Sequence, residues 1–370
     1  MEMTNYPEIT VMAGNFSYEG EIVCIKKIET GHINSTYVLT CKKADGSTIR
    51  YTFQTINTKV FTQPVELMEN FGNVTNYLRD VIAREGGDPE RGTLRLVLSK
   101  EGKNYYKDED GKYWRMYVYI DGVTSYQSVE RPILFENSAK AFGKFQKQLA
   151  SYPADTLHET IKQFHDTVKR FRDFEEAVAK DAMGRAKDIP DDIAFYLAHK
   201  DICGAITEKI ASGEIPLRVT HNDTKLNNIL MDSETDEAVC IIDLDTVMPG
   251  SALYDFGDSI RFGASSAAED EPDLSKVHFC PDLFEAYTRG YLSEAKDALN
   301  ETEKDLLPMS AILMTLECGM RFLGDYLNGD IYFAVHRPGQ NLDRSRTQMK
   351  LVSDMEAQLD DMKAIVAKYR

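Results

Sequence analysis

The sequence predicts an α+β fold with two lobes, an amino-terminal lobe built on an antiparallel sheet over residues 1–122 and a mainly helical lobe over residues 123–370. Three observations support this division. Short runs of strand-forming residues, separated by polar turns, fill much of the first lobe. After Arg131, apolar residues recur at helical spacing instead. A chain of 370 residues is also long enough to build two packed lobes.

Strands dominate the first lobe. We expect them over residues 21–26, 35–41, 49–56, 93–98 and 113–120. The turn Ala44-Asp45-Gly46-Ser47 is typical of a hairpin, so the early strands are predicted to form an antiparallel meander. One helix is expected in this lobe, over residues 64–85, because its apolar residues recur every three or four positions.

Helices dominate the second lobe. We expect them over residues 132–149, 156–181, 190–212, 281–299, 302–328 and 342–369. Pro132 opens the first of these, as is common in the first turn of a helix. The last has one apolar and one charged face, which predicts a helix packed on the protein rather than a membrane anchor.

Two groups of polar residues in the second lobe stand in an order typical of phosphotransferases. Asp223 is followed five residues later by Asn228, and Asp243 closes a later apolar run. Phosphotransferases use this order to place a base and two magnesium ligands on a nucleotide. We therefore predict Asp223 as the catalytic base, Asn228 and Asp243 as ligands of Mg²⁺, and ATP as the co-substrate.

The sequence between these groups predicts a hairpin. Residues 228–231 and 239–242 are apolar runs joined by a polar turn. Such a hairpin would set Asn228 roughly opposite Asp243, so that two oxygen ligands face one hard cation, as Mg²⁺ requires. A surface hairpin with acidic ends is the alternative, because acidic pairs on loops are common.

The connection between the first two strands occupies the position of the phosphate-covering loop of kinases. It contains Gly31, His32 and Asn34, which we predict to contact the nucleotide phosphates through backbone N–H groups and side chains. Only one glycine is present rather than the G-x-G-x-x-G pattern, so a plain hairpin loop is an equal interpretation.

The third and fifth strands supply the other nucleotide candidates. Gln54 stands on the third strand where a kinase carries a basic phosphate anchor, which leaves that anchor unassigned. Residues 115–122 run from a strand into a loop, as a hinge that binds adenine would. Met116, Tyr117 and Tyr119 are the hinge candidates, although alternating tyrosines equally fit a half-buried strand.

Composition excludes several classes of partner. The net charge of −17 and the isoelectric point of about 4.9 argue against nucleic acid and against an anionic membrane surface. The first residues lack the pattern of a secretory signal, and no uninterrupted apolar run reaches the length of a membrane span, so we expect a cytoplasmic protein. The six cysteines lie far apart in the sequence, which favours reduced thiols over disulfides or a zinc site.

Longer strings carry a resemblance to a known family. They are GHINSTYVL, YTFQTINTKVF, HNDTKLNNIL, IDLDTVMPG and CGMRFLGDYLNGDIYF. With these strings the whole chain resembles the aminoglycoside phosphotransferase and choline kinase-like superfamily, whose fold is protein-kinase-like. Within it, the chain looks like bacterial N-acetylhexosamine 1-kinases, which phosphorylate the anomeric hydroxyl of GlcNAc and GalNAc with ATP.

The resemblance also implies roles for single residues. Asp223 would hold the sugar hydroxyl as well as act as base, and Arg321 and Tyr332 match positions expected to bind the sugar. Without the family, a salt bridge from Arg321 to Asp325 is an equal explanation. Asp255 and Arg261 are expected to hold the catalytic loop in place. Asp245 is a candidate for a residue that contacts the metal ligands without binding the metal itself.

Three other functions remain open at the level of sequence. The chain could phosphorylate another small acceptor, such as an aminoglycoside, choline or homoserine. It could bind a nucleotide without catalysis if the missing basic anchor matters. It could also be a magnesium-dependent hydrolase, although that leaves the spacing of Asp223 and Asn228 unexplained.

Overall fold

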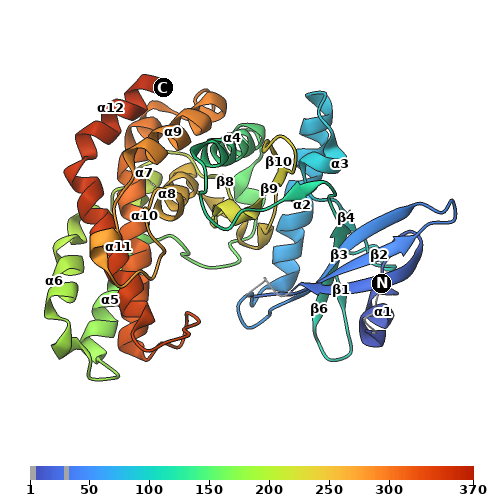
Figure 1. Ribbon diagram of the computed structural model, residues 1–370, viewed down its shortest axis with the longest axis horizontal. Coiled ribbons are helices and arrows are strands. Elements are labelled where there is room, and N and C mark those ends of the chain that lie inside the picture. Colours follow the sequence, from blue (N-terminus) through green and yellow to red (C-terminus); the bar gives the residue numbers. More distant parts are fainter. Residues whose placement is uncertain (1–5, 29–32) are drawn as a thin grey trace.

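The computed structural model describes residues 6–28 and 33–370 and confirms the predicted α+β fold, with a sheet on one side and a large group of helices on the other (Figure 1). The expected strands and most expected helices are present. The division at residue 122 stays a prediction, since one apolar core joins the two lobes across it, as described below.

The amino-terminal lobe contains a six-stranded antiparallel sheet with the order β1-β2-β3-β6-β4, and β5 pairs with β6. Its strands are β1 (Glu21–Ile28), β2 (Ser35–Lys42), β3 (Thr48–Ile56), β4 (Leu96–Val97), β5 (Tyr106–Lys107) and β6 (Tyr113–Val118). The strand expected over residues 93–98 is therefore shorter than predicted. The helices are α1 (Pro7–Ala13), α2 (Pro64–Arg84) and α3 (Pro89–Gly92).

Helix α2 connects the two lobes, and in Figure 1 it stands between the sheet and the helices. Its buried apolar face, which includes Leu67, Phe71 and Leu78, shares one cluster with Phe145 of the next long helix and with Leu244 near the predicted metal site. Burial of this surface away from water stabilises a fixed arrangement of the lobes around α2.

The second lobe is mainly helical. Its helices are α4 (Pro132–Gln148), α5 (Thr167–Lys180), α6 (Pro190–Ala198), α7 (Thr207–Ser212), α8 (Ala252–Gly263), α9 (Pro281–Ala295), α10 (Glu301–Asn328), α11 (Gln340–Ala357) and α12 (Leu359–Tyr369). Four expected helices are shorter or divided, and one of them, expected to reach residue 299, ends at Ala295. Asp166 caps α5 by accepting a hydrogen bond from the backbone N–H of Lys169, so the helix begins about ten residues later than expected. A 3₁₀ turn separates α6 from α7, and Gln358 separates α11 from α12.

Two small antiparallel sheets lie where the predicted hairpin was expected. One has the order β10-β9-β7, and the other pairs β11 with β8. Their strands are β7 (Val123–Thr124), β8 (Arg218–Thr220), β9 (Ile229–Asp232), β10 (Ala238–Ile241) and β11 (Met248–Gly250). Ile229 pairs with Ile241, so the hairpin is confirmed and Asp243 stands one residue beyond the position opposite Asn228.

Helix α10 is long and apolar. By length and composition it could cross a membrane, but 83% of its most apolar 18-residue window is buried inside the protein. It packs against α5, α8, α11 and α12. We therefore interpret α10 as the central helix of the second lobe.

Gly257 allows α8 and α10 to cross closely. A Cβ atom at this position would lie 2.4 Å from the carbonyl oxygen of Ser310 and 2.6 Å from Cγ of Met314. No side chain larger than hydrogen fits there without moving α10. This contact matters for the site because α8 carries Asp255 and Asp258, which hold the loop described below.

We predict that Gly257→Ala lowers the free energy of unfolding by about 2 kcal/mol or more, because overpacking forces the two helix backbones apart. Urea denaturation of wild type and variant measures this difference. Gly324→Ala in α10 is the matched control, since its Cβ would meet only Ala177 at 3.8 Å. That control should be neutral or up to about 1 kcal/mol more stable. Equal effects of the two substitutions would contradict the close crossing.

Candidate active site

The loop that carries Asp223 lies between β8 and β9 and is held by a buried carboxylate. Asp255 on α8 accepts hydrogen bonds from the backbone N–H groups of His221 (2.9 Å) and Asn222 (2.8 Å). Gln146 donates a third bond to the same carboxylate at 3.0 Å. Asn222 adopts a left-handed backbone conformation, with φ of 65°. That conformation is uncommon outside glycine, although asparagine tolerates it better than most residues. The expected bracing role of Asp255 follows directly from these bonds.

Both carboxylate oxygens of Asp223 have partners. Asn228 donates from Nδ2 to Oδ2 of Asp223 at 3.1 Å and to its backbone carbonyl at 2.8 Å. Lys225 lies 2.8 Å from Oδ1, and the charge of Asp223 raises the pKa of Lys225 above its usual range. Asp258 accepts a hydrogen bond from the N–H of Thr224 at 3.1 Å, which holds this part of the loop against α8. Asp223 is thus oriented by its own loop.

The segment with Asp243 is hydrogen bonded to the same loop. The N–H of Ile242 donates to the carbonyl of Asn228 at 2.9 Å. His221 donates from Nε2 to the carbonyl of Ile242, also at 2.9 Å. Asp243 itself has φ of 60°, again in the left-handed region, just beyond β10. The structure therefore brings the three predicted residues Asp223, Asn228 and Asp243 to one place.

This place suits a hard cation. Among residues 6–28 and 33–370, no group of three or more histidine, cysteine or acidic side chains could hold a metal by itself. Asn228 donates both of its hydrogen bonds to Asp223 from Nδ2, so its amide oxygen Oδ1 takes no part in them. An amide oxygen and the carboxylate of Asp243 fit Mg²⁺, which normally takes one or two protein oxygens and completes its shell with phosphates and water.

A buried basic residue, which the sequence had not revealed, lies beside the predicted metal ligands. Arg115 on β6 forms a two-pronged ion pair with Asp245, in which Nη1 contacts Oδ1 and Nη2 lies 3.1 Å from Oδ2. Gln54 and Asn34, both predicted to bind the nucleotide, hydrogen bond to this pair. Arg115 was not identified from the sequence because its position beside Gln54 depends on the register of β3 and β6, which residue spacing alone does not give.

The other nucleotide candidates have different surroundings. Gly31 and His32 lie outside the described residues. Met116 and Tyr117 lie inside β6 and pair with β3 on one side and β4 on the other. Their role in a hinge that binds adenine stays a prediction. Tyr119 follows directly after the end of β6, and its hinge role also stays a prediction. The N–H of Tyr119 donates to the carbonyl of Arg50 at 3.0 Å.

The two predicted sugar residues lie together at the end of α10. The guanidinium of Arg321 faces the rings of Phe164, Tyr332 and Phe333, at 5.5, 5.8 and 5.4 Å from their centroids. Tyr332 is 67% exposed, so a ligand can reach it. The alternative explanation of Arg321 does not hold, because Asp325 has other partners. The carboxylate of Asp325 accepts hydrogen bonds from the backbone N–H groups of residues 331–333.

A buried chain of contacts joins Arg321 to the loop with Asp223. Arg321 lies 3.9 Å from Oε1 of Glu317, and Nδ1 of His165 lies 3.0 Å from the same oxygen. The other ring nitrogen of His165 lies 3.3 Å from the carbonyl of Asn222. The two groups of predicted site residues are therefore connected through the protein interior.

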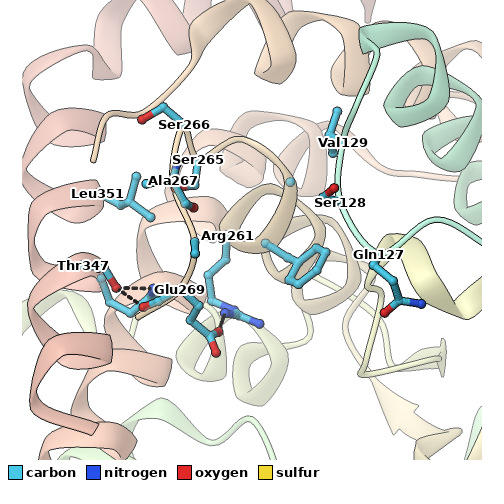
Figure 2. A pocket seen from close by; sticks show the side chains of 14 residues that line it. Gln127, Ser128, Val129, Arg261, Ser265, Ser266, Ala267, Glu269, Thr347 and Leu351 are labelled. Carbon is cyan, nitrogen blue, oxygen red and sulfur yellow. Dashed lines mark hydrogen bonds and ion pairs between the residues drawn. The ribbon is translucent and has the colours of Figure 1, made fainter. Parts of the chain in front are cut away.

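Arg261 has a bracing role, as expected. It donates from Nε to Asp258 at 2.9 Å and from Nη1 to Glu269 at 2.7 Å. Figure 2 shows Arg261 beside a cavity of about 460 Å³ between the end of α8, the linker at residues 127–129 and α11. None of the residues predicted to bind metal or sugar lines this cavity.

Comparison with known proteins identifies a matching family and similar folds. A model of the phosphotransferase enzyme family matches residues 25–301. A microcompartment-associated aminopropanol kinase is similar over 97% of this chain and 99% of its own, with a TM-score of 0.62 and 15% identity. A choline kinase from Cryptosporidium parvum is similar over 97% of each chain, with a TM-score of 0.57 and 16% identity. An aminoglycoside phosphotransferase from Alicyclobacillus acidocaldarius covers 100% of this chain and 98% of its own, with a TM-score of 0.57 and 14% identity. At these identities the structures support the fold.

Asp243 should make stability depend on pH in the absence of metal. Loss of hydration, together with the charges of Asp245 and Asp223, raises the pKa of Asp243 to about 6. An aspartate in the unfolded chain has a pKa of about 4, so the ionised form weakens the fold progressively from about pH 4 and fully above about pH 6. Part of Asp243 is exposed to solvent, which screens the repulsion and reduces this cost.

We predict that Asp243→Asn stabilises the metal-free protein by up to about 1 kcal/mol near neutral pH, after allowance for solvent screening, and leaves stability unchanged near pH 3.5. Urea denaturation in the presence of a chelator, repeated across this pH range, measures the difference. Asp361→Asn, on an exposed face of α12, is the control and should show no such trend. A gain that is the same at every pH would contradict a raised pKa at Asp243.

Proposed function

The chain belongs to the phosphotransferase enzyme family, and we propose that it is an ATP-dependent kinase that phosphorylates the anomeric hydroxyl of an N-acetylhexosamine, GlcNAc or GalNAc. The product would be the sugar 1-phosphate. We further propose Mg²⁺ as the metal and the cytoplasm as the location. The fold, the family and the placing of Asp223, Asn228 and Asp243 support a small-molecule kinase. The choice of a sugar as the acceptor depends on the surroundings of Arg321.

In this proposal Asp223 orients the sugar hydroxyl and accepts its proton as the hydroxyl attacks the γ-phosphoryl group. The hydrogen bond from Asn228 and the ion pair with Lys225 hold its carboxylate in place for this task. Magnesium, when bound through Asn228 and Asp243, would neutralise negative charge on the phosphates. An anomeric hydroxyl is more acidic than an ordinary alcohol, so the base that accepts its proton does not need special tuning.

The observation that carries the sugar proposal is the position of Arg321. A kinase of a cationic alcohol needs aromatic faces or carboxylates to hold the ammonium group. Here the guanidinium of Arg321 already occupies the faces of Phe164, Tyr332 and Phe333. Burial, followed by the charge of Arg321, lowers the pKa of nearby Arg170, so a second guanidinium lies close to Arg321. This environment suits sugar hydroxyls and an N-acetyl carbonyl, both of which accept hydrogen bonds from guanidinium.

One observation favours a second candidate, a kinase of an amino alcohol or aminoglycoside. Oε2 of Glu317 is buried and has no hydrogen-bond partner among the described residues. An ammonium group of an acceptor could pair with it if Arg321 moved. The similarity to aminopropanol and choline kinases is compatible with this candidate.

An acceptor panel separates the two candidates. Purified protein with ATP and Mg²⁺ is offered GlcNAc, GalNAc, glucose, choline, aminopropanol and an aminoglycoside, and ADP formation is measured. We expect turnover with an N-acetylhexosamine, and a product whose phosphorus couples to C1 of the sugar by NMR. Turnover with the amino alcohols alone, or phosphate release without any acceptor, would reject the sugar proposal.

We predict that Asp223→Asn lowers kcat by at least about a thousandfold and leaves ATP binding within a few-fold of wild type, because the amide cannot accept the proton. Steady-state kinetics and calorimetric titration with a non-hydrolysable ATP analogue measure the two quantities. Asp201→Asn, at an exposed position, is the control for mutation of an aspartate. Near-normal turnover of the Asp223 variant would remove Asp223 from the proposed role.

A further inference from the structure

The basic group missing from β3 is present on the adjacent strand. Gln54 of β3 pairs in register with Arg115 of β6, so the two side chains are neighbours on one face of the sheet. The guanidinium of Arg115 donates from Nε to Oε1 of Gln54 at 2.9 Å. Gln54 in turn donates from Nε2 to Oγ1 of Thr36 at 2.8 Å. Gln54 therefore orients an arginine instead of acting as the anchor itself.

Arg115 is directed toward the metal-binding segment and not toward open space for phosphates. Its side chain and that of Asp245 are each only 2% exposed. Both oxygens of Asp245 contact the guanidinium, and Asn34 at the start of β2 donates to Oδ2 of the same carboxylate at 2.6 Å. Asp245 is thus held by residues of the amino-terminal sheet, although it belongs to the other lobe.

A buried ion pair of this kind adds little net stability to the contact between the two lobes. Both charges lose their hydration, and apolar residues of similar volume often give equal stability. Asp245 stands two residues after Asp243, whose left-handed backbone is uncommon for a residue other than glycine. Fixing Asp245 therefore limits the directions in which the Asp243 carboxylate can point.

We propose that Arg115 is a positioning residue that, through Asp245, holds Asp243 in the direction needed to bind a Mg²⁺–nucleotide complex. This inference rests on the proposed kinase function but not on the identity of the acceptor. Arg115 itself is too buried to contact a phosphate in this arrangement. It serves the site through a carboxylate, whereas the basic residue on the third strand of protein kinases contacts the phosphates directly.

The test replaces the whole pair, so that no unpaired charge is left in the interior. Arg115→Met with Asp245→Leu is compared with wild type by titrating a non-hydrolysable ATP analogue at increasing Mg²⁺ concentration. We expect the Mg²⁺ concentration for half-maximal binding to rise at least tenfold, while thermal unfolding changes little. Arg115→Lys keeps the charge but cannot bridge both oxygens of Asp245 as well as Gln54, so it should show a smaller rise.

A second two-pronged arginine–carboxylate pair supplies the matched control. Arg346 on α11 contacts both oxygens of the buried Asp192, at 2.8 and 3.0 Å, in the helical lobe. Arg346→Met with Asp192→Leu should leave the Mg²⁺ requirement unchanged. A wild-type requirement in the Arg115 variants, or an equal rise in the control, would overturn the inference. If the double Arg115 variant does not fold, the Arg115→Lys result decides in the same way.

Failure of the Arg115 inference can be distinguished from failure of the proposed function. If wild type binds the nucleotide with Mg²⁺ but phosphorylates no sugar, the sugar proposal fails and the Arg115 inference is still tested by its variants. If wild type shows no effect of Mg²⁺ on nucleotide binding, the inference fails whatever the acceptor panel shows.

Discussion

The carboxylate of Asp255 is the interaction on which the site depends most. It is completely buried. It accepts hydrogen bonds from two backbone N–H groups of the loop with Asp223 and from the side-chain amide of Gln146. A buried charge persists when hydrogen bonds replace its lost hydration. Those bonds fix the backbone immediately before Asp223. The close crossing of α8 and α10 then determines where Asp255 lies, so helix packing outside the loop determines the geometry of the loop.

The second constraint is electrostatic. Asp223, Asp243 and Asp245 lie close enough for the first and last to help raise the pKa of Asp243. Lys225 pairs with Asp223, and Arg115 pairs with Asp245. Asp243 makes no such ion pair with the described residues, and a divalent cation would offset its charge. A carboxylate that costs stability without its ligand is a common feature of binding sites.

Local patterns predicted much of this structure. The meander of strands, the hairpin after Asn228 and the order of Asp223, Asn228 and Asp243 could be derived because each depends on short-range spacing. Other features depend on contacts between distant residues. The pairing of Arg115 with Asp245 joins positions 130 residues apart and leaves no local signal. The break after α6 had a local signal in the polar run His199-Lys200-Asp201 and in Gly204, whereas no proline or glycine marks the break at Gln358.

A crystal structure of the protein with ADP and Mg²⁺ would show whether Asn228 and Asp243 bind the metal. We expect one magnesium ion bound by Oδ1 of Asn228 and by the carboxylate of Asp243, each at about 2.1 Å, while Asp245 stays paired with Arg115. An ion bound by Asp245 in place of Asp243, or one that contacts neither Asn228 nor Asp243, would contradict it.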